Sequence, residues 1–166
     1  MQKSSDLHQF FRKVDDGIFK AELVIGVSLT VVMVAAVFLQ VVFRYVVNQP
    51  LSWSEELARY IFVWASMIGA SMGVKKKSHF GLDALLKLFP RTQKKATEII
   101  LYCLMSILLI ILVYYGVQFS RELYVQTAPG LNITMAIPYA AMPVGGLLML
   151  LHIVLMPFAK SEDRER

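Results

Sequence analysis

Residues Phe43 to Trp64 read FRYVVNQPLSWSEELARYIFVW and separate two apolar stretches long enough to cross a membrane. Pro50 is expected to end the structure that precedes it, because proline cannot continue a helix past its own position. Ser52 and Glu55 have the spacing of a capping box, in which each side chain bonds a free backbone N–H of the first helical turn. This pattern predicts a new helix that starts near Ser52.

The same stretch carries four charges. Glu55 and Arg59 are four residues apart, with the acid on the N-terminal side, so they are expected to pair on the helix. Glu56 lies about 100° around the helix from Glu55, and Arg44 is its nearest candidate partner in sequence. Two interpretations remain open at this stage. The charges either form a compensated cluster that faces protein, or they lie at the membrane interface beside lipid headgroups.

Composition indicates a single membrane domain over residues 1–166. The chain is 57% hydrophobic and 17% charged, with a mean hydropathy of +0.57, which is too apolar for an ordinary soluble domain. The net charge of +5 does not indicate nucleic-acid binding, because lysine and arginine flank the apolar stretches without forming a basic face interleaved with aromatic residues. Cys103 is the only cysteine, which excludes a disulfide, a redox pair or a cysteine metal site within the chain.

The fold class expected is an all-α integral membrane protein with four transmembrane helices and short amphipathic interfacial helices. Each apolar stretch approaches the length of about 20 residues that a helix needs to cross a bilayer. Two prolines and two glycines predict that the fourth span is kinked. The N-terminal segment has amphipathic spacing, and a solvated, frayed terminus is the alternative. The expected segments are an amphipathic segment over 1–22, spans over 23–43, 54–74, 94–118 and 136–159, an interfacial helix over 78–91, and a polar tail over 160–166.

Three smaller patterns carry weaker hypotheses. Gly69 and Gly73 form a Gly-x-x-x-Gly pair, which allows two helices to approach closely in lipid, although the pattern is common by chance. His79 and Asp83 have i, i+4 spacing that could ligate a metal, but two ligands alone favour an ordinary polar pair on a helix surface. His152 lies inside the fourth span, where a packed interface residue is the favoured interpretation.

Orientation follows from the distribution of basic residues between the two sides of four crossings. The positive-inside rule places the side richer in lysine and arginine in the cytoplasm, together with both termini and the middle loop. The richer side carries Lys3, Arg12, Lys13, Lys20, Lys75, Lys76, Lys77, Lys87, Arg91, Lys94, Lys95, Lys160, Arg164 and Arg166, and the other side carries Arg44, Arg59 and Arg121.

The chain resembles the small membrane subunit, of the DctQ type, of tripartite ATP-independent periplasmic (TRAP) transporters. The resemblance covers essentially the whole chain. It departs from the family pattern at Ser71, where alanine is usual, and at Lys75 to Lys77, where arginine is usual. The matching residues are Phe43-Arg-Tyr-Val, Asn48, Leu51-Ser-Trp53, Glu55-Glu56, Arg59, Phe62-Val-Trp64, Gly69-Ala70, His79, Asp83, Ile137-Pro-Tyr and Met142-Pro-Val-Gly145.

This resemblance implies a partner and no enzymatic activity. Small subunits of this family bind a large membrane subunit that carries substrate and sodium, and a periplasmic binding protein delivers an organic anion such as sialic acid or a C4-dicarboxylate. We therefore expect a scaffold subunit in the bacterial inner membrane, surrounded by lipid, with no catalytic residue, cofactor or metal. The interface or structural candidates are Arg44, Asn48, Trp53, Glu55, Glu56, Arg59, Trp64, Gly69, Gly73, His79, Asp83, Pro143 and Gly145.

Two other functions would need residues that the spans do not supply. An autonomous proton-coupled transporter, acting as a homo-oligomer, would need a carboxylate well inside the bilayer, and Glu56 lies too close to the outer interface. A membrane redox enzyme would need a cysteine pair or two facing histidines, which the spans do not supply. The centres of the spans contain no Asp, Glu, Lys or Arg over residues 31–40, 63–73, 102–113 and 144–152. The sequence therefore favours a subunit that does not itself carry substrate or ion.

Overall fold

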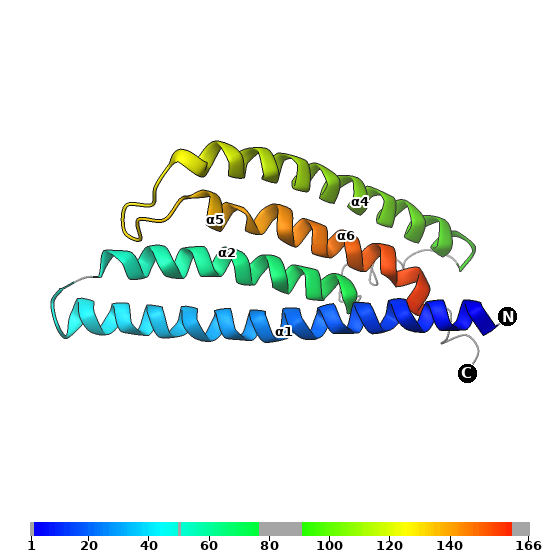
Figure 1. Ribbon diagram of the computed structural model, residues 1–166, viewed down its shortest axis with the longest axis horizontal. Helices are drawn as coiled ribbons and strands as arrows, with labels where there is room; N and C mark the ends of the chain where they lie inside the picture. The colour runs from blue at the N-terminus through cyan, green and yellow to red at the C-terminus, as the bar shows by residue number, and fades with distance from the viewer. Residues whose placement is uncertain (1, 50, 77–90, 161–166) are drawn as a thin grey trace.

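The computed structural model describes residues 2–49, 51–76 and 91–160, and Figure 1 shows their arrangement as a layered bundle of long helices. Within these ranges the backbone is helical apart from short connections and one isolated antiparallel bridge between Thr127 and Thr134. The elements are α1 (Gln2–Tyr45), α2 (Ser52–Lys75), α4 (Arg91–Glu122), the 3-10 turn η1 (Leu123–Val125), α5 (Ala136–Tyr139) and α6 (Ala141–Lys160). The interfacial helix expected over 78–91 falls almost entirely outside the described residues.

Four of the helical segments are long and apolar enough to cross a membrane. They cover Gln9–Tyr45, Ser52–Lys75, Ile99–Val125 and Ala136–Met156. The expected all-α architecture with four candidate spans is confirmed. Each candidate span overlaps an expected one, but the first begins at Gln9 where residue 23 was expected, and the third ends at Val125 where residue 118 was expected.

The first helix differs from the expectation of a separate amphipathic segment over 1–22. α1 is one continuous helix of 44 residues, without a break between that segment and the apolar span. At a rise of 1.5 Å per residue it is about 66 Å long, roughly twice the 30 Å hydrocarbon core of a bilayer. Contacts described below hold the N-terminal half of α1 against α2 and α6. These contacts explain why the polar segment continues the helix.

The start of α2 corrects the predicted capping box. The helix begins at Ser52 as expected, but Leu51 occupies the N-cap position and no side chain caps the first turn. Ser54 is buried and its hydroxyl donates to the carbonyl oxygen of Leu51 at 2.7 Å, while the Glu55 carboxylate turns to Arg59. The Ser54 hydroxyl thus stabilises the start of α2 by bonding a backbone carbonyl, and it does not cap a backbone N–H group.

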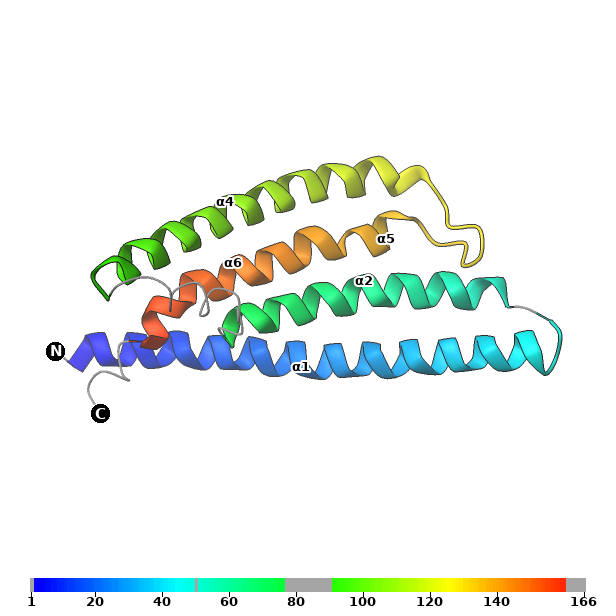
Figure 2. The ribbon, with the colours of Figure 1, turned by 180° about the vertical axis from the view of Figure 1, so that it is seen from behind.

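Helix α6 is the central element of the bundle. It contacts α2 on one side and α4 on the other, and its C-terminal part reaches α1, an order that is visible from both sides in Figures 1 and 2. The apolar core between these helices contains Val74, Leu109 and Met149, with Met67 and Leu112 packed against it. Because apolar burial does not by itself drive helix association in lipid, close side-chain packing is needed to hold such a bundle together.

Small residues make that packing possible. A Cβ atom added at Gly145 would lie 2.7 Å from Cβ of Met67, so α2 and α6 approach one another too closely for a larger residue. On the other face of α6, a Cβ at Gly116 of α4 would lie 2.9 Å from the ring of Pro143. Pro143 and Gly145, both predicted candidates, therefore pack between helices.

The fourth span, for which a kink was expected, is interrupted at Ala140. α5 ends at Tyr139 and α6 begins at Ala141, with Ala140 between them. The backbone N–H of Ala140 still donates to the Ala136 carbonyl at 2.9 Å, and Val144 donates to Ala140 at 3.2 Å, so the chain keeps its helical direction. The interruption places α5 beside the loop that precedes it.

Candidate functional site

Glu56 organises the hydrogen bonds at the end of the bundle where the chain passes from α1 to α2. One carboxylate oxygen accepts hydrogen bonds from the backbone N–H groups of Gly130 and Leu131, at 2.8 and 3.0 Å. The other oxygen accepts a bond from the hydroxyl of Tyr60 at 3.0 Å. A charged acceptor bonded by backbone amides makes one of the stronger kinds of protein hydrogen bond. Glu56 thus ties α2 to the loop between η1 and α5.

That loop is a compact hairpin held by its own backbone. Ala128 donates to the Ile133 carbonyl at 2.8 Å, and Met135 donates to Gln126 at 2.9 Å. Gly130 lies so close to α2 that a Cβ there would be 2.7 Å from Oε2 of Glu56. Any side chain at this position would push the carboxylate away from the two backbone N–H groups. Figures 1 and 2 show the loop beside the start of α2.

The four predicted charges do not form one cluster. Arg59 donates to Glu55 at 3.1 Å as predicted, but both side chains are largely exposed, at 67% and 63%. The suggested contact between Arg44 and Glu56 is not among the ion pairs of the described residues. The guanidinium of Arg44 instead lies 5.9 Å from the centroid of the Tyr45 ring. Glu56 is a backbone-binding residue, and the other three charges lie at the surface.

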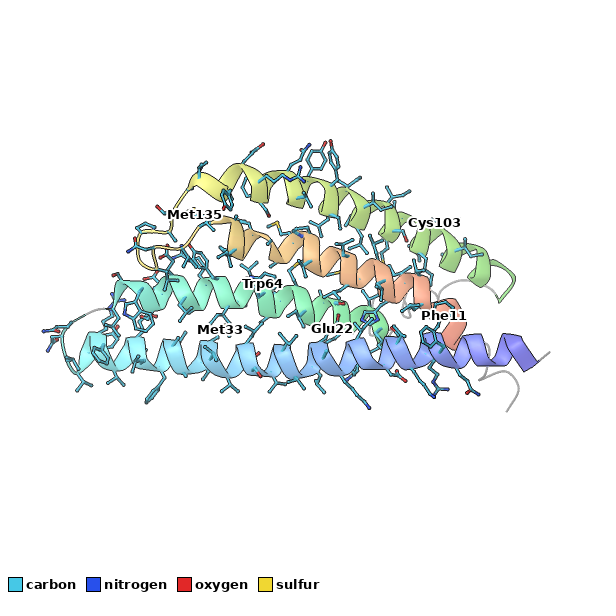
Figure 3. The ribbon with its side chains drawn as sticks, viewed as in Figure 1. Phe11, Glu22, Met33, Trp64, Cys103 and Met135 are labelled. Carbon is cyan, nitrogen blue, oxygen red and sulfur yellow. The ribbon has the colours of Figure 1, made fainter. Side chains whose placement is uncertain are left out.

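Asn48 and the two tryptophans shape the same end. Asn48 has a φ of 57°, a left-handed conformation that asparagine tolerates better than most residues, and the chain turns there from α1 toward α2. Trp53 lies beside Gly130, whose added Cβ would be 3.2 Å from the Trp53 Cα. The indole N–H of Trp64 donates to the Ile137 carbonyl at 3.2 Å, which joins α2 to α5 (Figure 3).

Among the described residues, the Gly-x-x-x-Gly pair does not pack against another helix. Cβ atoms added at Gly69 and Gly73 would meet nothing within 4 Å. Phe62, Ser66, Gly69 and Ala70 are all exposed on α2. The structure therefore leaves this small-residue face open. The other predicted pair, His79 and Asp83, lies outside the described residues.

A second polar site, which sequence reasoning missed, lies at the opposite end of the bundle. His152 of α6 is 2% exposed, and its Nδ1 and Nε2 atoms lie 2.6 Å from Oδ1 of Asp15 and 3.1 Å from Oε2 of Glu22. The hydroxyl of Ser71 in α2 donates to the other oxygen of Glu22 at 2.7 Å. Figure 3 shows Glu22 on the side of α1 that faces α2. Three helices thus contribute to one buried network.

Lysine from α2 completes this network at its outer edge. Nζ of Lys75 lies 3.1 Å from Oδ2 of Asp15 and 2.8 Å from Oδ1 of Asp16. The same ammonium lies 5.0 Å from the centroid of the Phe19 ring. Asp15 and Glu22 approach opposite edges of the His152 ring, and no group of three or more metal-binding side chains converges within the described ranges. The arrangement serves charge compensation between helices.

One signal in the sequence could have revealed this network. Asp15 and Glu22 are seven residues apart, which places them on one face of a helix, two turns from one another. That spacing has meaning only if both residues belong to one continuous helix that packs inside the bundle. The expectation of a separate surface segment over 1–22 did not place them there. The partner helix α6 could not be chosen from the sequence, because nothing in it says which helix His152 faces.

These features define a small multi-pass membrane protein whose polar residues join helices to one another. The family model for "Tripartite ATP-independent periplasmic transporters, DctQ component" matches residues 33–160, and the chain belongs to this family. It is the small permease component of a TRAP transporter and not an enzyme. The resemblance stated from the sequence is confirmed.

Three curated relatives illustrate the range of the family. A sialic acid TRAP transporter permease protein of Haemophilus influenzae (strain 86-028NP) is 30% identical over 136 residues, which are 81% of this chain but 22% of that protein. A putative TRAP transporter small permease protein of H. influenzae (strain Rd) is 24% identical over 93% of this chain and 95% of the relative. A C4-dicarboxylate small permease protein of Vibrio cholerae is 26% identical over 70% of this chain and 61% of the relative.

Replacement of Glu56 by alanine should loosen the loop over 126–135. The backbone N–H groups of Gly130 and Leu131 would lose their acceptor, and a loss of about 2 to 3 kcal/mol in unfolding free energy is expected for bonds to a charged group. The matched control is Glu55→Ala, which removes an exposed pair worth about 0.5 kcal/mol or less. Thermal unfolding of the purified full chain and protease cleavage of the loop measure both variants. Equal effects of the two substitutions would contradict the role assigned to Glu56.

Proposed function

We propose that this chain is a stationary scaffold subunit that binds a large membrane subunit of a TRAP transporter in the bacterial inner membrane. It supports sodium-gradient-driven import of an organic anion, of the sialic acid or C4-dicarboxylate class, which a periplasmic binding protein delivers. The observation that carries the proposal is the long permease relative. There, a segment similar to this chain makes up 22% of a single longer protein that is named a sialic acid transporter.

The distribution of charge favours a scaffold over a carrier. The central parts of the four spans contain no Asp, Glu, Lys or Arg, so a coupled ion or anionic substrate would find no charged partner there. The carboxylates that are buried, Asp15 and Glu22, are already engaged by His152. Glu56 is engaged by backbone N–H groups of the loop. None of these groups is left to bind a transported ion.

The outer side is the end that carries Glu56 and the loop over 126–135, as the positive-inside rule indicates. Arg44, Arg59 and Arg121 lie toward this end, whereas Lys75 and Lys76 lie toward the other. The inner side then holds the network around His152. In this orientation the hairpin loop faces the compartment of the binding protein.

Cysteine labelling tests this orientation. In a Cys103→Ser background, single cysteines at the exposed positions Gln49 and Gln126 should react with a membrane-impermeant thiol reagent added from the periplasmic side. A cysteine at Lys76, which is also exposed, is the matched control and should react only after the membrane is opened. Labelling of Lys76→Cys from the periplasmic side would exclude the proposed orientation.

The open small-residue face of α2 is the contact surface that we assign to the large subunit. Ser66, Gly69 and Gly73 offer little side-chain volume, and backbones approach closely at such faces in lipid. At Gly116 and Gly145, side chains of neighbouring helices already occupy the space that a Cβ atom would need. Gly69 and Gly73 have no such neighbour within 4 Å, which leaves room for a helix of another subunit.

Replacement of Gly69 by leucine should therefore reduce recovery of the two-subunit complex by roughly tenfold or more, the effect of about 1.4 kcal/mol, without unfolding the small subunit. A Cβ atom added at Gly69 would lie more than 4 Å from the described residues of other helices, so thermal stability of the subunit alone should stay near the wild-type value. Ala35→Leu, an equally small-to-large change on an exposed face of α1, is the control. Co-purification with a tagged large subunit measures the effect. Unchanged recovery for Gly69→Leu would show that this face contacts lipid.

Reconstitution tests the function as a whole. Proteoliposomes that contain this chain alone should show no uptake, whereas addition of the large subunit, the binding protein and a sodium gradient should produce uptake of sialic acid or of a C4-dicarboxylate. Glu56→Gln should leave the sodium dependence per assembled complex unchanged, because Glu56 serves the loop. Uptake by the small subunit alone, or a shifted sodium dependence in this variant, would contradict the scaffold function.

A further inference from the structure

The ring of His152 lies between two carboxylates in the interior of the bundle. Nδ1 is 2.6 Å from Asp15 and Nε2 is 3.1 Å from Glu22, and both distances are those of hydrogen bonds. The side chain of His152 has no exposed surface, and those of Asp15 and Glu22 are 9% and 4% exposed. Water therefore has little access to any of the three groups.

This geometry sets the number of protons in the network. A neutral imidazole has one N–H donor, and its other nitrogen carries a lone pair that accepts. A carboxylate oxygen also only accepts, so a neutral ring between two carboxylates would place a lone pair against a lone pair. Each of the two short contacts needs a hydrogen between its atoms. The arrangement is satisfied when the ring carries hydrogens on both nitrogens.

The surrounding charges agree with a protonated ring. On α1, Asp15 and Glu22 face the ring directly, and Asp16 is half-exposed next to them. On α2, Lys75 contacts Asp15 and Asp16, and the neutral hydroxyl of Ser71 bonds Glu22. Arg12 and Lys20 act on Asp16 from the same helix. None of the ion pairs of the described residues involves α4.

Two buried carboxylates are therefore matched by two cations only when His152 is charged. Lys75 pairs with Asp15 and Asp16, whereas Glu22 pairs with His152, so with a neutral ring the buried charge of Glu22 would remain uncompensated. Such a charge is strongly destabilising in a protein interior, where removal of one partner of a buried ion pair costs several kcal/mol. The network thus binds a proton as an essential component of its charge balance.

We propose that Asp15, Glu22 and His152 form a proton-binding site that fastens α6 to α1. The proton is held as the second ring hydrogen of His152, and its loss separates the charges that join these two helices. Glu22 lies about 10 Å further along α1 than Asp15, at 1.5 Å per residue, so the site extends inward from the bundle end at which Lys75 lies. The site concerns the fold of this chain alone and does not depend on which substrate the transporter takes.

The protonation of the two ring nitrogens of His152 is the first measurement that tests the proposal. The full chain, labelled with ¹⁵N-histidine and reconstituted in lipid bilayers, should show both nitrogens of His152 protonated at about pH 7.5, where a free histidine ring is largely neutral. The His152 signals are identified by their loss in His152→Gln. A ring with one unprotonated nitrogen would overturn the proposal, including the case in which a carboxyl group carries the proton in its place.

Dependence of stability on pH provides the second measurement. Because the folded chain holds a proton that the unfolded chain releases, raising the pH from about 6 to about 9 should lower the melting temperature of the full chain. The expected slope is roughly 2 to 4 °C per pH unit over the range in which the folded chain keeps this proton and the unfolded chain has released it. Glu22→Gln removes the second carboxylate and thus the need for the second ring hydrogen, so this pH dependence should be largely lost.

The matched control is Glu122→Gln, the same chemical change at an exposed position of α4, which should keep the wild-type pH dependence. If His152→Gln does not fold, the comparison of Glu22→Gln with Glu122→Gln and the nitrogen measurement still decide the matter. Identical pH dependence in wild type and Glu22→Gln would overturn the proposal.

Discussion

Charge compensation inside an apolar bundle is the constraint on which this structure depends. His152 of α6 meets Asp15 and Glu22 of α1, and Ser71 and Lys75 of α2 complete the same network. A charged group inside a membrane protein is tolerated when it faces protein and finds a partner. α1 supplies the partners of both other helices, since Asp15 and Glu22 bond His152 of α6 and also Lys75 and Ser71 of α2. The network therefore fixes which faces of α1, α2 and α6 point inward.

The opposite end of the bundle uses a different device for the same purpose. Glu56 satisfies two backbone N–H groups of the loop and the hydroxyl of Tyr60, so its charge is spread over donors and no cation is required. Trp64 adds a bond from α2 to α5. Between the two ends, the helices contact through apolar side chains and small residues such as Gly145. Polar bonds at both ends and close packing in the middle together resist sliding of one helix past another.

Local patterns in the sequence predicted the four apolar helices, because a run of about 20 apolar residues has few other stable structures in a membrane, but they did not predict that α1 continues unbroken from Gln2. They also predicted the pair Glu55 and Arg59, which depends on helix spacing alone. The partner of Glu56 could not be predicted in this way, because Gly130 lies 74 residues away and contributes only its backbone N–H. Almost every residue has a backbone N–H, so the residue type does not show which N–H will bind a carboxylate. The same holds for His152, whose two partners lie 137 and 130 residues away.

The spacing of the glycines in the sequence does not show which of them pack tightly in the structure. By spacing alone, Gly69 and Gly73 form a helix-packing motif, whereas Gly116 belongs to no motif and Gly145 stands out only through the family resemblance. In the structure, a Cβ atom at Gly116 would clash with Pro143 and one at Gly145 with Met67, whereas Cβ atoms at Gly69 and Gly73 would meet none of the described residues within 4 Å. A helix interior gains stability when alanine replaces glycine, by about 1 kcal/mol, unless the missing side chain has a purpose. Gly116 and Gly145 have that purpose within the chain. Gly69 and Gly73 have no such contact among the described residues, and a second subunit of the transporter is the occupant that we propose for this face.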